Sequence, residues 1–312
     1  MLVTEDADVY KPDGSLLLKY RKDVIPELVA IDSYNIFRVS KSIFPGKNGG
    51  NRGMAGGANN VGAKRVFRKL SDGRQSRTSI SVNTANSGVI GYFDRYPRIP
   101  FCRQKAFNSR FPERWKKLRR MIKLVDEAFR VLEPQRYRAQ RQVADLSSRD
   151  FTITDTAFTT LTVNCNFRTA LHKDAGDLRE GFGVMCAFRG GNFSGGYTIF
   201  PQFRVAVDMQ NRGLLLADVH EWHCNSPIIG KPGRYKRYSC VFYFREGIKV
   251  CGTADHELEI AKNQAVEIFK CSLYSYRAVA GQTIALLVVC YQKATSNILL
   301  SLNHKKKKTT GK

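Results

Sequence analysis

The stretch FTTLTVNCNFRTALHKDAGD, residues 158–177, belongs to a series of short apolar segments that decides the fold. These segments are rich in β-branched and aromatic residues, and Gly, Asn, Asp or Pro separates one from the next. They are FTITD (151–155), FTTLTVN (158–164), GFGVMCAF (181–188), GYTIF (196–200), RVAVD (204–208), GLLLADV (213–219) and RYSCVFYF (237–244). Short strands in direct succession predict a β-sandwich or jelly roll rather than βαβ units.

Upstream of these strands, PERWKKLRRMIKLVDEAFRVLEP (112–134) predicts an amphipathic helix. Apolar residues recur there at steps of three and four, the period of one helix face. Asn108 and Ser109 are the candidate caps before it, and Pro134 predicts its end. Because such helices pack on one sheet, we expect an α+β fold with a jelly-roll core and N-terminal supporting helices.

The same patterns divide the chain into three parts. Residues 1–84 form an N-terminal extension that contains a glycine-rich loop at 46–65. Residues 85–250 form the main domain, with its jelly-roll core at 151–247, and residues 251–312 form a C-terminal helix and a basic tail. The glycine-rich loop lacks the residue order of a phosphate-binding P-loop, so a surface loop is its simplest interpretation.

The composition is that of a globular protein, with 43% hydrophobic residues and a mean hydropathy of -0.33. The apolar run at 284–290 is far shorter than the roughly 18–20 residues of a membrane-spanning helix. The first residues, MLVTEDADVYKPDG, lack the apolar centre of a signal peptide. We therefore expect an intracellular protein without a membrane partner. Its 8 cysteines form no CxxC pair, which predicts buried reduced thiols rather than a zinc ribbon.

Charge indicates a polyanionic partner, because Lys and Arg total 51 against 27 acidic residues, a net charge of +24. A solvated basic surface and ribosome association are the alternatives, but the basic residues cluster, which favours nucleic acid. The best candidate for a phosphate-contacting surface is 103–141, and a solvated helix face remains the other interpretation. The candidate nucleic-acid contacts are Arg52, Arg65, Arg114, Lys117, Arg120 and Arg138.

Histidines are few, and their spacing predicts a metal site. His172 and Asp174 are two residues apart, so on an extended segment both side chains point to one side. A third ligand would come from DVHEWHCNSPI (218–228), where His220 and His223 compete. We favour His223, because a small polar turn containing Asn225 follows it, and we place His220 behind the ligands. Two imidazoles and one carboxylate suit Fe(II), since they leave positions open for co-substrate and O₂. Satisfied core histidines are the alternative.

Arg237 begins the strand segment RYSCVFYF downstream of His223. A guanidinium that enters the core there needs a carboxylate partner, and a dicarboxylate co-substrate would supply one through a bidentate pair. Ser239 faces the same side and can add a hydrogen bond. Arg234 is the alternative residue for this role.

Four stretches of this region resemble the TET and J-base-binding-protein group of 2-oxoglutarate/Fe(II) dioxygenases, and most closely its phage, viral and algal members. They are FTTLTVNCNFRTALHKDAGD, GNFSGGYTIFPQFRVAVD, LLLADVHEWHCN and KRYSCVFYF, and the resemblance covers about 85–245. It implies a double-stranded β-helix that hydroxylates the 5-methyl group of thymine or 5-methylcytosine in DNA. In a duplex the target base would have to flip out of the stack.

The resemblance also implies roles for single residues. His172, Asp174 and His223 would hold the iron, and Arg237 would bind the distal carboxylate of 2-oxoglutarate. Asn164 and Asn166 would face the co-substrate or the base, while Asp177 would lie close to the co-substrate site. Some algal relatives use ascorbate, which is therefore the alternative co-substrate.

The expected partner is double- or single-stranded DNA, and we expect a monomer located in the nucleus or at a nucleoid, encoded by a cell, a virus or a phage. Two other functions stay open. One is a protein or small-molecule hydroxylase of the same fold, which the positive charge argues against. The other is a nucleic-acid-binding jelly roll without catalysis, which the His, Asp and Arg set argues against.

Overall fold

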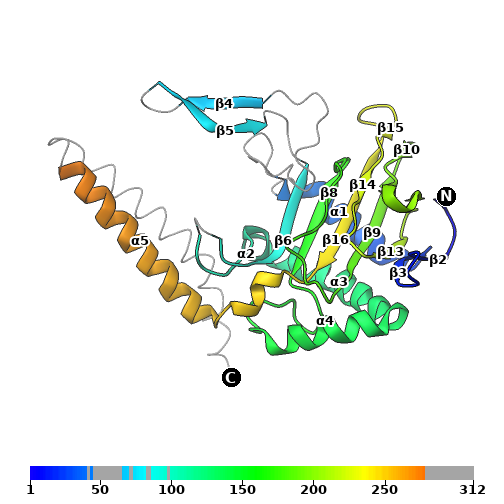
Figure 1. Cartoon of the computed structure of the whole chain (residues 1–312), viewed down its shortest axis with the longest axis horizontal. Coiled ribbons are helices and arrows are strands. Elements are labelled where there is room, and N and C mark those ends of the chain that lie inside the picture. Colours follow the sequence, from blue (N-terminus) through cyan, green and yellow to red (C-terminus); the bar gives the residue numbers. More distant parts are fainter. Residues whose placement is uncertain (41–42, 45–64, 70–72, 82–85, 97–98, 278–312) are drawn as a thin grey trace.

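The structure is a computed structural model, and it describes the chain except for residues 41–42, 45–64, 70–72, 82–85, 97–98 and 278–312 (Figure 1). Arg52, most of the glycine-rich loop and the basic tail lie outside the described residues. Arg65 is the first residue of strand β4 (Arg65–Lys69), which pairs with β5 (Gln75–Ser81) in a separate two-stranded sheet.

The centre of the fold is an eight-stranded antiparallel sheet, which we call the major sheet, in the order β2-β3-β13-β9-β16-β8-β6-β7. Its strands are β2 (Ala7–Tyr10), β3 (Leu16–Arg21), β6 (Ser87–Phe93), β7 (Arg103–Gln104), β8 (Thr160–Cys165), β9 (Gly183–Gly190), β13 (Leu214–Ala217) and β16 (Lys236–Tyr243). The predicted strand at 151–155 is wrong, because those residues form bends and turns before β8.

A minor sheet has the order β1-β12-β11-β14. Its strands are β1 (Leu2–Val3), β11 (Thr198–Phe200), β12 (Val205–Val207) and β14 (Cys224–Asn225), and a 3-10 turn at Pro201–Phe203 joins β11 to β12. A two-stranded pair of β10 (Ser194–Gly195) and β15 (Ile228–Ile229) extends beside it. Two facing sheets, the major one antiparallel and the minor one antiparallel except for the β1–β12 pair, with helices outside, fit the predicted α+β jelly roll.

Side-chain alternation along β9 separates two hydrophobic cores. Val184, Cys186 and Phe188 pack with the helices in one cluster, whereas Met185 and Ala187 pack with residues of the minor sheet in another. Because successive strand residues point to opposite faces, the helices cover one face of the major sheet and the minor sheet covers the other. The functional site lies on the minor-sheet side.

The supporting helices are α1 (Glu27–Val39), α2 (Ala106–Arg110), α3 (Pro112–Leu132) and α4 (Pro134–Leu146). The predicted helix therefore exists, and Pro134 opens α4 at a position where a missing N–H costs nothing. The predicted caps are wrong, because residue 111 stands at the start of α3. Asn108 is buried in α2 and instead accepts from the Gly91 N–H and donates to the Gly91 carbonyl.

Residues 1–39 differ from the predicted N-terminal extension, because they complete both sheets. Strand β1 pairs in parallel with β12, and β3 pairs with β13. Added strands satisfy edge N–H and C=O groups that would otherwise be unpaired. The stretch had suggested only short apolar runs, which carry too little periodicity to reveal pairing with strands about 200 residues later.

The prediction of reduced cysteines fails for two of them. Cys102 and Cys251 form a disulfide across a separation of 149 residues, while Cys165, Cys186, Cys224 and Cys240 are free thiols. After a 3-10 turn at Glu246–Val250, helix α5 (Ala254–Arg277) leaves the sheets at an angle (Figure 1). Among the described residues, no helix combines the length and the apolar character needed to span a bilayer.

Candidate metal centre

Two loops meet on the minor-sheet side of the major sheet and bring the predicted ligands together. His172 and Asp174 follow β8, whereas His223 directly precedes β14. The backbones of His172 and His223 form an antiparallel bridge in which each N–H donates to the other's carbonyl at 2.9 Å. Asp174 is fixed in turn by its N–H, which donates to the Val219 carbonyl at 3.0 Å.

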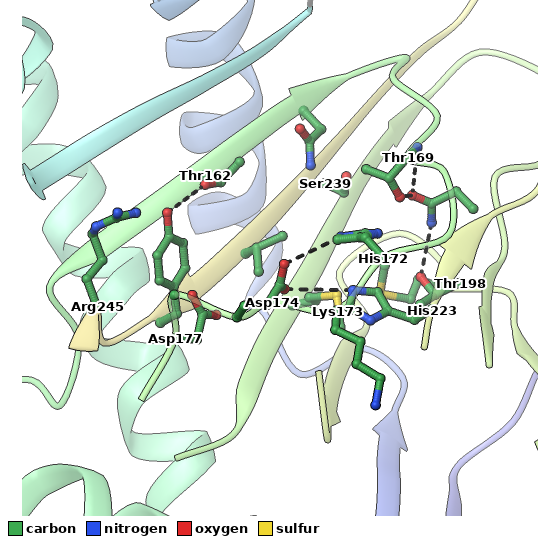
Figure 2. Close-up of a pocket in the computed structure, with 18 of the residues that line it drawn as sticks. Thr162, Thr169, His172, Lys173, Asp174, Asp177, Thr198, His223, Ser239 and Arg245 are labelled. Carbon is green, nitrogen blue, oxygen red and sulfur yellow. Dashed lines mark hydrogen bonds and ion pairs between the residues drawn. The ribbon is translucent and has the colours of Figure 1, made fainter. Parts of the chain in front are cut away.

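The three side chains converge on one point (Figure 2). His172 Nε2 lies 3.4 Å from Asp174 Oδ1, and His223 Nε2 lies 3.7 Å from Asp174 Oδ2. One ligand atom from each residue falls within 4.8 Å of the other two. The imidazole ring centres are 4.2 Å apart. This spacing leaves room for a single ion among the three side chains.

Backbone carbonyls orient both imidazoles in the same way. His172 Nδ1 lies 2.7 Å from the Ala170 carbonyl, and His223 Nδ1 lies 2.9 Å from the Glu221 carbonyl. A carbonyl can only accept, so in each neutral ring Nδ1 carries the proton and Nε2 keeps its lone pair. This arrangement is the usual support of a metal-binding histidine.

The electrostatics of the cluster favour a carboxylate beside one neutral imidazole. Burial lowers the pKa of His223, which keeps its ring neutral. Burial opposes a charge on Asp174, but the hydrogen bond with His172 and the charges of the histidines outweigh it and lower the pKa of Asp174. For His172, burial is outweighed by the bond to Asp174, so its pKa is raised. A cation bound at this point would compete with a proton for His172 Nε2.

The cluster opens into a cavity of about 610 Å³, within the usual size range of ligand sites. Asp177 and Arg245 lie toward one end of it, and Thr169 and Thr198 lie beyond the histidines at the other (Figure 2). The remaining lining residues are Phe93, Tyr96, Thr162, Asn164, Lys173, Ala175, Gly176, Met185, Met209, Asn225, Ser239, Val241 and Tyr243.

Arg237 is buried, with 3% of its surface exposed, and its Nη2 has no hydrogen-bond partner among the described residues. It stands on the same face of β16 as Ser239, which lines the cavity. The close approach of Gly196 makes room for it, since a Cβ there would lie 3.3 Å from Arg237 Cδ. Burial lowers the pKa of Arg237 to about 10. A buried cation with an unpaired nitrogen fits an anionic ligand. The alternative residue, Arg234, is exposed.

The two predicted asparagines separate in the structure. Asn164 lines the cavity, and its Oδ1 is buried without a donor among the described residues. Asn166 is not among the lining residues, contrary to prediction. It has a left-handed backbone with φ 46°, accepts from the Arg237 N–H at 2.6 Å and donates to the Tyr235 carbonyl. Its amide therefore fixes the start of β16 rather than a ligand.

The residues expected around the ligands take three positions. Asp177 lines the cavity, where burial and the Asp174 carboxylate raise its pKa well above the usual value. His220 lies outside the lining, 3.5 Å from Asp218 and 3.4 Å from the Asp177 carbonyl. Asn225 lines the cavity and accepts from the Thr169 hydroxyl at 2.6 Å.

Comparison with known proteins identifies this oxygenase domain. Residues 88–246, about half of the chain, match the family Tet_JBP, described as the oxygenase domain of the 2OGFeDO superfamily. The chain belongs to this family. The structure of NgTET1 in complex with 5mC DNA is similar in fold, with a TM-score of 0.52 at 15% identity over 84% of this chain and 89% of that one.

Curated relatives of this Tet_JBP chain include two trypanosomatid proteins. The thymine dioxygenase JBP1 of Leishmania braziliensis is 34% identical over 168 residues, 52% of this chain and 20% of that protein. The bifunctional helicase and thymine dioxygenase JBP2 of Trypanosoma brucei brucei is 29% identical over 218 residues, 68% of this chain and 18% of that protein. The chain thus spans about a fifth of the length of these relatives.

The helical part of the predicted nucleic-acid surface lies away from the cavity of this Tet_JBP domain, although Arg103 and Lys105 at its start pack against the cavity residue Phe93. Lys117, Arg120 and Arg138 are exposed on α3 and α4, on the helix side of the major sheet, whereas the cavity lies on the minor-sheet side. Arg114 is partly buried, stacks on Phe111 and donates to the Ser40 hydroxyl. Helix α3 is amphipathic because its apolar face packs on the sheet. Packing of the apolar face is by itself enough to explain why the basic residues lie on the opposite, solvent-facing side.

Sequence reasoning missed several cavity residues. Val241, Tyr243 and Arg245 continue the two-residue alternation that begins at Arg237 and Ser239, so the period of the strand could have revealed them. Phe93 and Tyr96 come from the end of β6 and the turn after it, about 75 residues before the ligands. Pairing of β6 with β8 brings them there, and nothing in the sequence marks that pairing.

Proposed function

We propose that this chain is an Fe(II)- and 2-oxoglutarate-dependent dioxygenase that hydroxylates the 5-methyl group of thymine or 5-methylcytosine in DNA. One observation carries the proposal: a two-histidine, one-carboxylate cluster opens into a cavity lined by Ser239, and the buried Arg237, whose Nη2 has no partner among the described residues, stands two residues before Ser239 on the same strand. Membership of the Tet_JBP family and the similarity to thymine dioxygenases support the choice of substrate.

In this proposal His172, Asp174 and His223 hold the iron. This set of two imidazoles and one carboxylate suits Fe(II), since it would leave positions for co-substrate and O₂. Bound Fe(II) with 2-oxoglutarate supplies the oxidation, which consumes O₂, releases CO₂ and succinate, and leaves one oxygen atom on the methyl carbon. The backbone carbonyls behind each Nδ1 keep both Nε2 lone pairs aimed at the ion.

Arg237 would hold the distal carboxylate of 2-oxoglutarate, with Ser239 beside it. The orphaned Nη2 supports this role, because a carboxylate is the partner that a buried guanidinium lacks here. Asn164 would face the co-substrate or the base, where its buried Oδ1, which lacks a donor among the described residues, can accept a hydrogen bond. Ascorbate is the alternative co-substrate, and as an anion it would use the same cation.

The target base would enter the cavity from the exposed rim, after flipping out of the DNA stack at a cost of a few kcal/mol. Two exposed residues contact members of the cavity lining: Trp222, whose ring centre lies 5.6 Å from Lys173 Nζ, and Arg168, whose Nε donates to the Asn225 carbonyl at 3.1 Å. An exposed aromatic ring beside a cation suits a nucleic-acid strand, since the ring can stack on a base while the cation meets a phosphate. We place the DNA contact there rather than on α3.

In this proposal the enzyme acts as a monomer. A DNA substrate would place it in the nucleus or at a nucleoid. Whether the gene is cellular, viral or phage-borne has no bearing on this chemistry.

The direct test is incubation of the purified chain with Fe(II), 2-oxoglutarate and DNA that contains thymine or 5-methylcytosine. Nucleoside mass spectrometry should find hydroxymethyluracil or hydroxymethylcytosine with the wild type and neither with Asp174→Ala. Succinate release without a modified base would indicate a protein or small-molecule hydroxylase instead. Neither product, from a chain that binds Fe(II), would refute the enzyme. Parallel reactions with ascorbate identify the co-substrate.

A further inference from the structure

Phe93 and Tyr96 form an aromatic wall on one side of the cavity. The Phe93 ring is surrounded by three cations, with Arg245 at 4.1 Å, Lys105 at 4.6 Å and Arg103 at 5.2 Å from its centre. Tyr96 is 59% exposed, so it stands at the mouth rather than in the core. A planar base that enters the cavity would meet these two rings.

The wall belongs to a short hairpin whose arms are β6 and β7. Phe93 pairs with Arg103 across the hairpin, and farther out the Tyr96 and Ile99 backbones exchange hydrogen bonds of 2.9 and 2.7 Å. Between them, Asp94 accepts from Arg245 Nε at 2.9 Å. The hairpin therefore has its own backbone pairing, but β7 is an edge strand of only two residues.

Both arms of the hairpin are fastened to the segment Cys251–Glu257. Glu257, 1% exposed, accepts from Arg95 Nη2 at 2.6 Å on the first arm and from the Cys102 N–H at 2.6 Å on the second. Glu257 Oε1, the oxygen that accepts from Arg95 Nη2, also accepts from the Gly252 N–H at 2.8 Å. The Cys102–Cys251 disulfide joins the second arm to the same segment.

Glu257 is held as a carboxylate. Burial opposes its charge, but the bonds from Arg95, Cys102 and Gly252 outweigh burial and lower the pKa of Glu257. A buried carboxylate with this many donors is costly to lose, since each donor would be left unpaired. Residues 251–257 lie beyond the 88–246 match to the Tet_JBP family, so this fastening is an addition to the matched domain.

We propose that Glu257 and the Cys102–Cys251 disulfide are positioning elements that hold the Phe93–Tyr96 wall in place for the substrate base. The inference rests on the proposed function of the cavity. Neither element touches the His172, Asp174 and His223 cluster, so they act on the entering base and not on iron or 2-oxoglutarate. Reduction of the disulfide would weaken the same wall, which gives the enzyme a redox-dependent affinity for DNA.

The test compares wild type with Glu257→Gln, which keeps the shape and removes the charge. Hydrogen–deuterium exchange should rise in 94–96 and 99–105, and the KM for DNA should rise roughly 5- to 20-fold, the loss of one or two charge-assisted bonds. The KM for 2-oxoglutarate and kcat should stay within about twofold, a difference too small to reflect a lost contact. Arg95→Lys, on a partly exposed residue, should give the same pattern more weakly if Glu257→Gln fails to fold.

Glu259→Gln is the matched control, because Glu259 is exposed on the same helix and pairs only with Lys262 among the described contacts. Dithiothreitol should shift the wild type toward the pattern of the Cys102→Ser/Cys251→Ser double variant and leave that variant unchanged. Unchanged exchange at the wall, or a kcat loss without a KM change for DNA, would overturn the inference. If the wild type itself modifies no base, the proposed function fails, while exchange and DNA binding by fluorescence anisotropy still decide the role of Glu257.

Discussion

Replacing Arg237 with Met should abolish tight binding of 2-oxoglutarate. The same change should not destabilise the protein when no 2-oxoglutarate is bound. Arg237 is 3% exposed and its Nη2 has no partner among the described residues, so the guanidinium bears a desolvation cost that its contacts offset only in part. Met fills similar volume and removes that cost. We therefore expect the melting temperature of the variant without 2-oxoglutarate to equal or exceed that of the wild type.

The magnitude for binding follows from the lost pair. Removing one partner of a buried, hydrogen-bonded charge pair costs about 2–5 kcal/mol, which corresponds to a loss of roughly 30-fold or more in affinity. At a concentration 100 times the wild-type Kd, the co-substrate stabilises the wild type by about 2.7 kcal/mol. For a variant that binds 30-fold more weakly, the same concentration gives only about 0.9 kcal/mol.

The assay is thermal unfolding under nitrogen with Fe(II), with and without 2-oxoglutarate, supported by calorimetric titration. Arg237→Lys keeps the charge but loses the forked geometry, so its shift should lie between those of wild type and Arg237→Met. Arg234→Met is the control, because Arg234 is exposed nearby and should leave the shift intact. A full wild-type shift in Arg237→Met would refute the assignment of the co-substrate carboxylate to Arg237.

Three further predictions concern the metal, the DNA and pH. Chelation of Fe(II) should abolish base oxidation and lower the melting temperature, and added Fe(II) should restore both. Activity and thermal unfolding assays measure these effects, and activity that survives chelation would contradict the metal centre. The double variant Lys173→Gln/Trp222→Ala should weaken DNA binding, measured by anisotropy, about tenfold or more, since stacking on one base is worth about 1–3 kcal/mol. Lys117→Gln/Arg120→Gln should weaken DNA binding far less. A larger loss in the second variant than in the first would place the interface on α3. Because the pKa of Glu257 lies below its usual value of 4.5, its stabilising bonds are complete above that value and are lost as pH falls through the lowered pKa. The wild type should thus lose more of its stability than Glu257→Gln between about pH 5 and 3, by urea unfolding, and equal losses would contradict it.

The strand pattern of 158–244 was sufficient to predict the sheets around the ligands, because period-two alternation and turn residues are local signals. The segment FTITD failed, although it alternates like a strand, because its residues turn at Asp155, where φ is 60°. Pairing over long distances was beyond local reasoning. Strand β3, LLLKYR, pairs with β13, LLLA, and no feature of either sequence predicts that the two strands are neighbours.

At the site, chemistry with a short spacing was predictable and contacts from distant segments were not. His172 and Asp174 stand two residues apart, so extended geometry alone places them together. Asn166 was misplaced because its left-handed backbone, a conformation that asparagine tolerates, turns its amide toward β16. The Cys102–Cys251 disulfide was missed because its cysteines show no local motif and are 149 residues apart.

Anomalous diffraction at the iron edge, from crystals of this chain grown without oxygen in Fe(II) and 2-oxoglutarate, tests the central claim most directly. The account predicts one iron peak bounded by His172 Nε2, Asp174 and His223 Nε2, with the far carboxylate of 2-oxoglutarate on Arg237. An iron peak elsewhere, or a 2-oxoglutarate whose far carboxylate pairs with Arg245 instead, would contradict it.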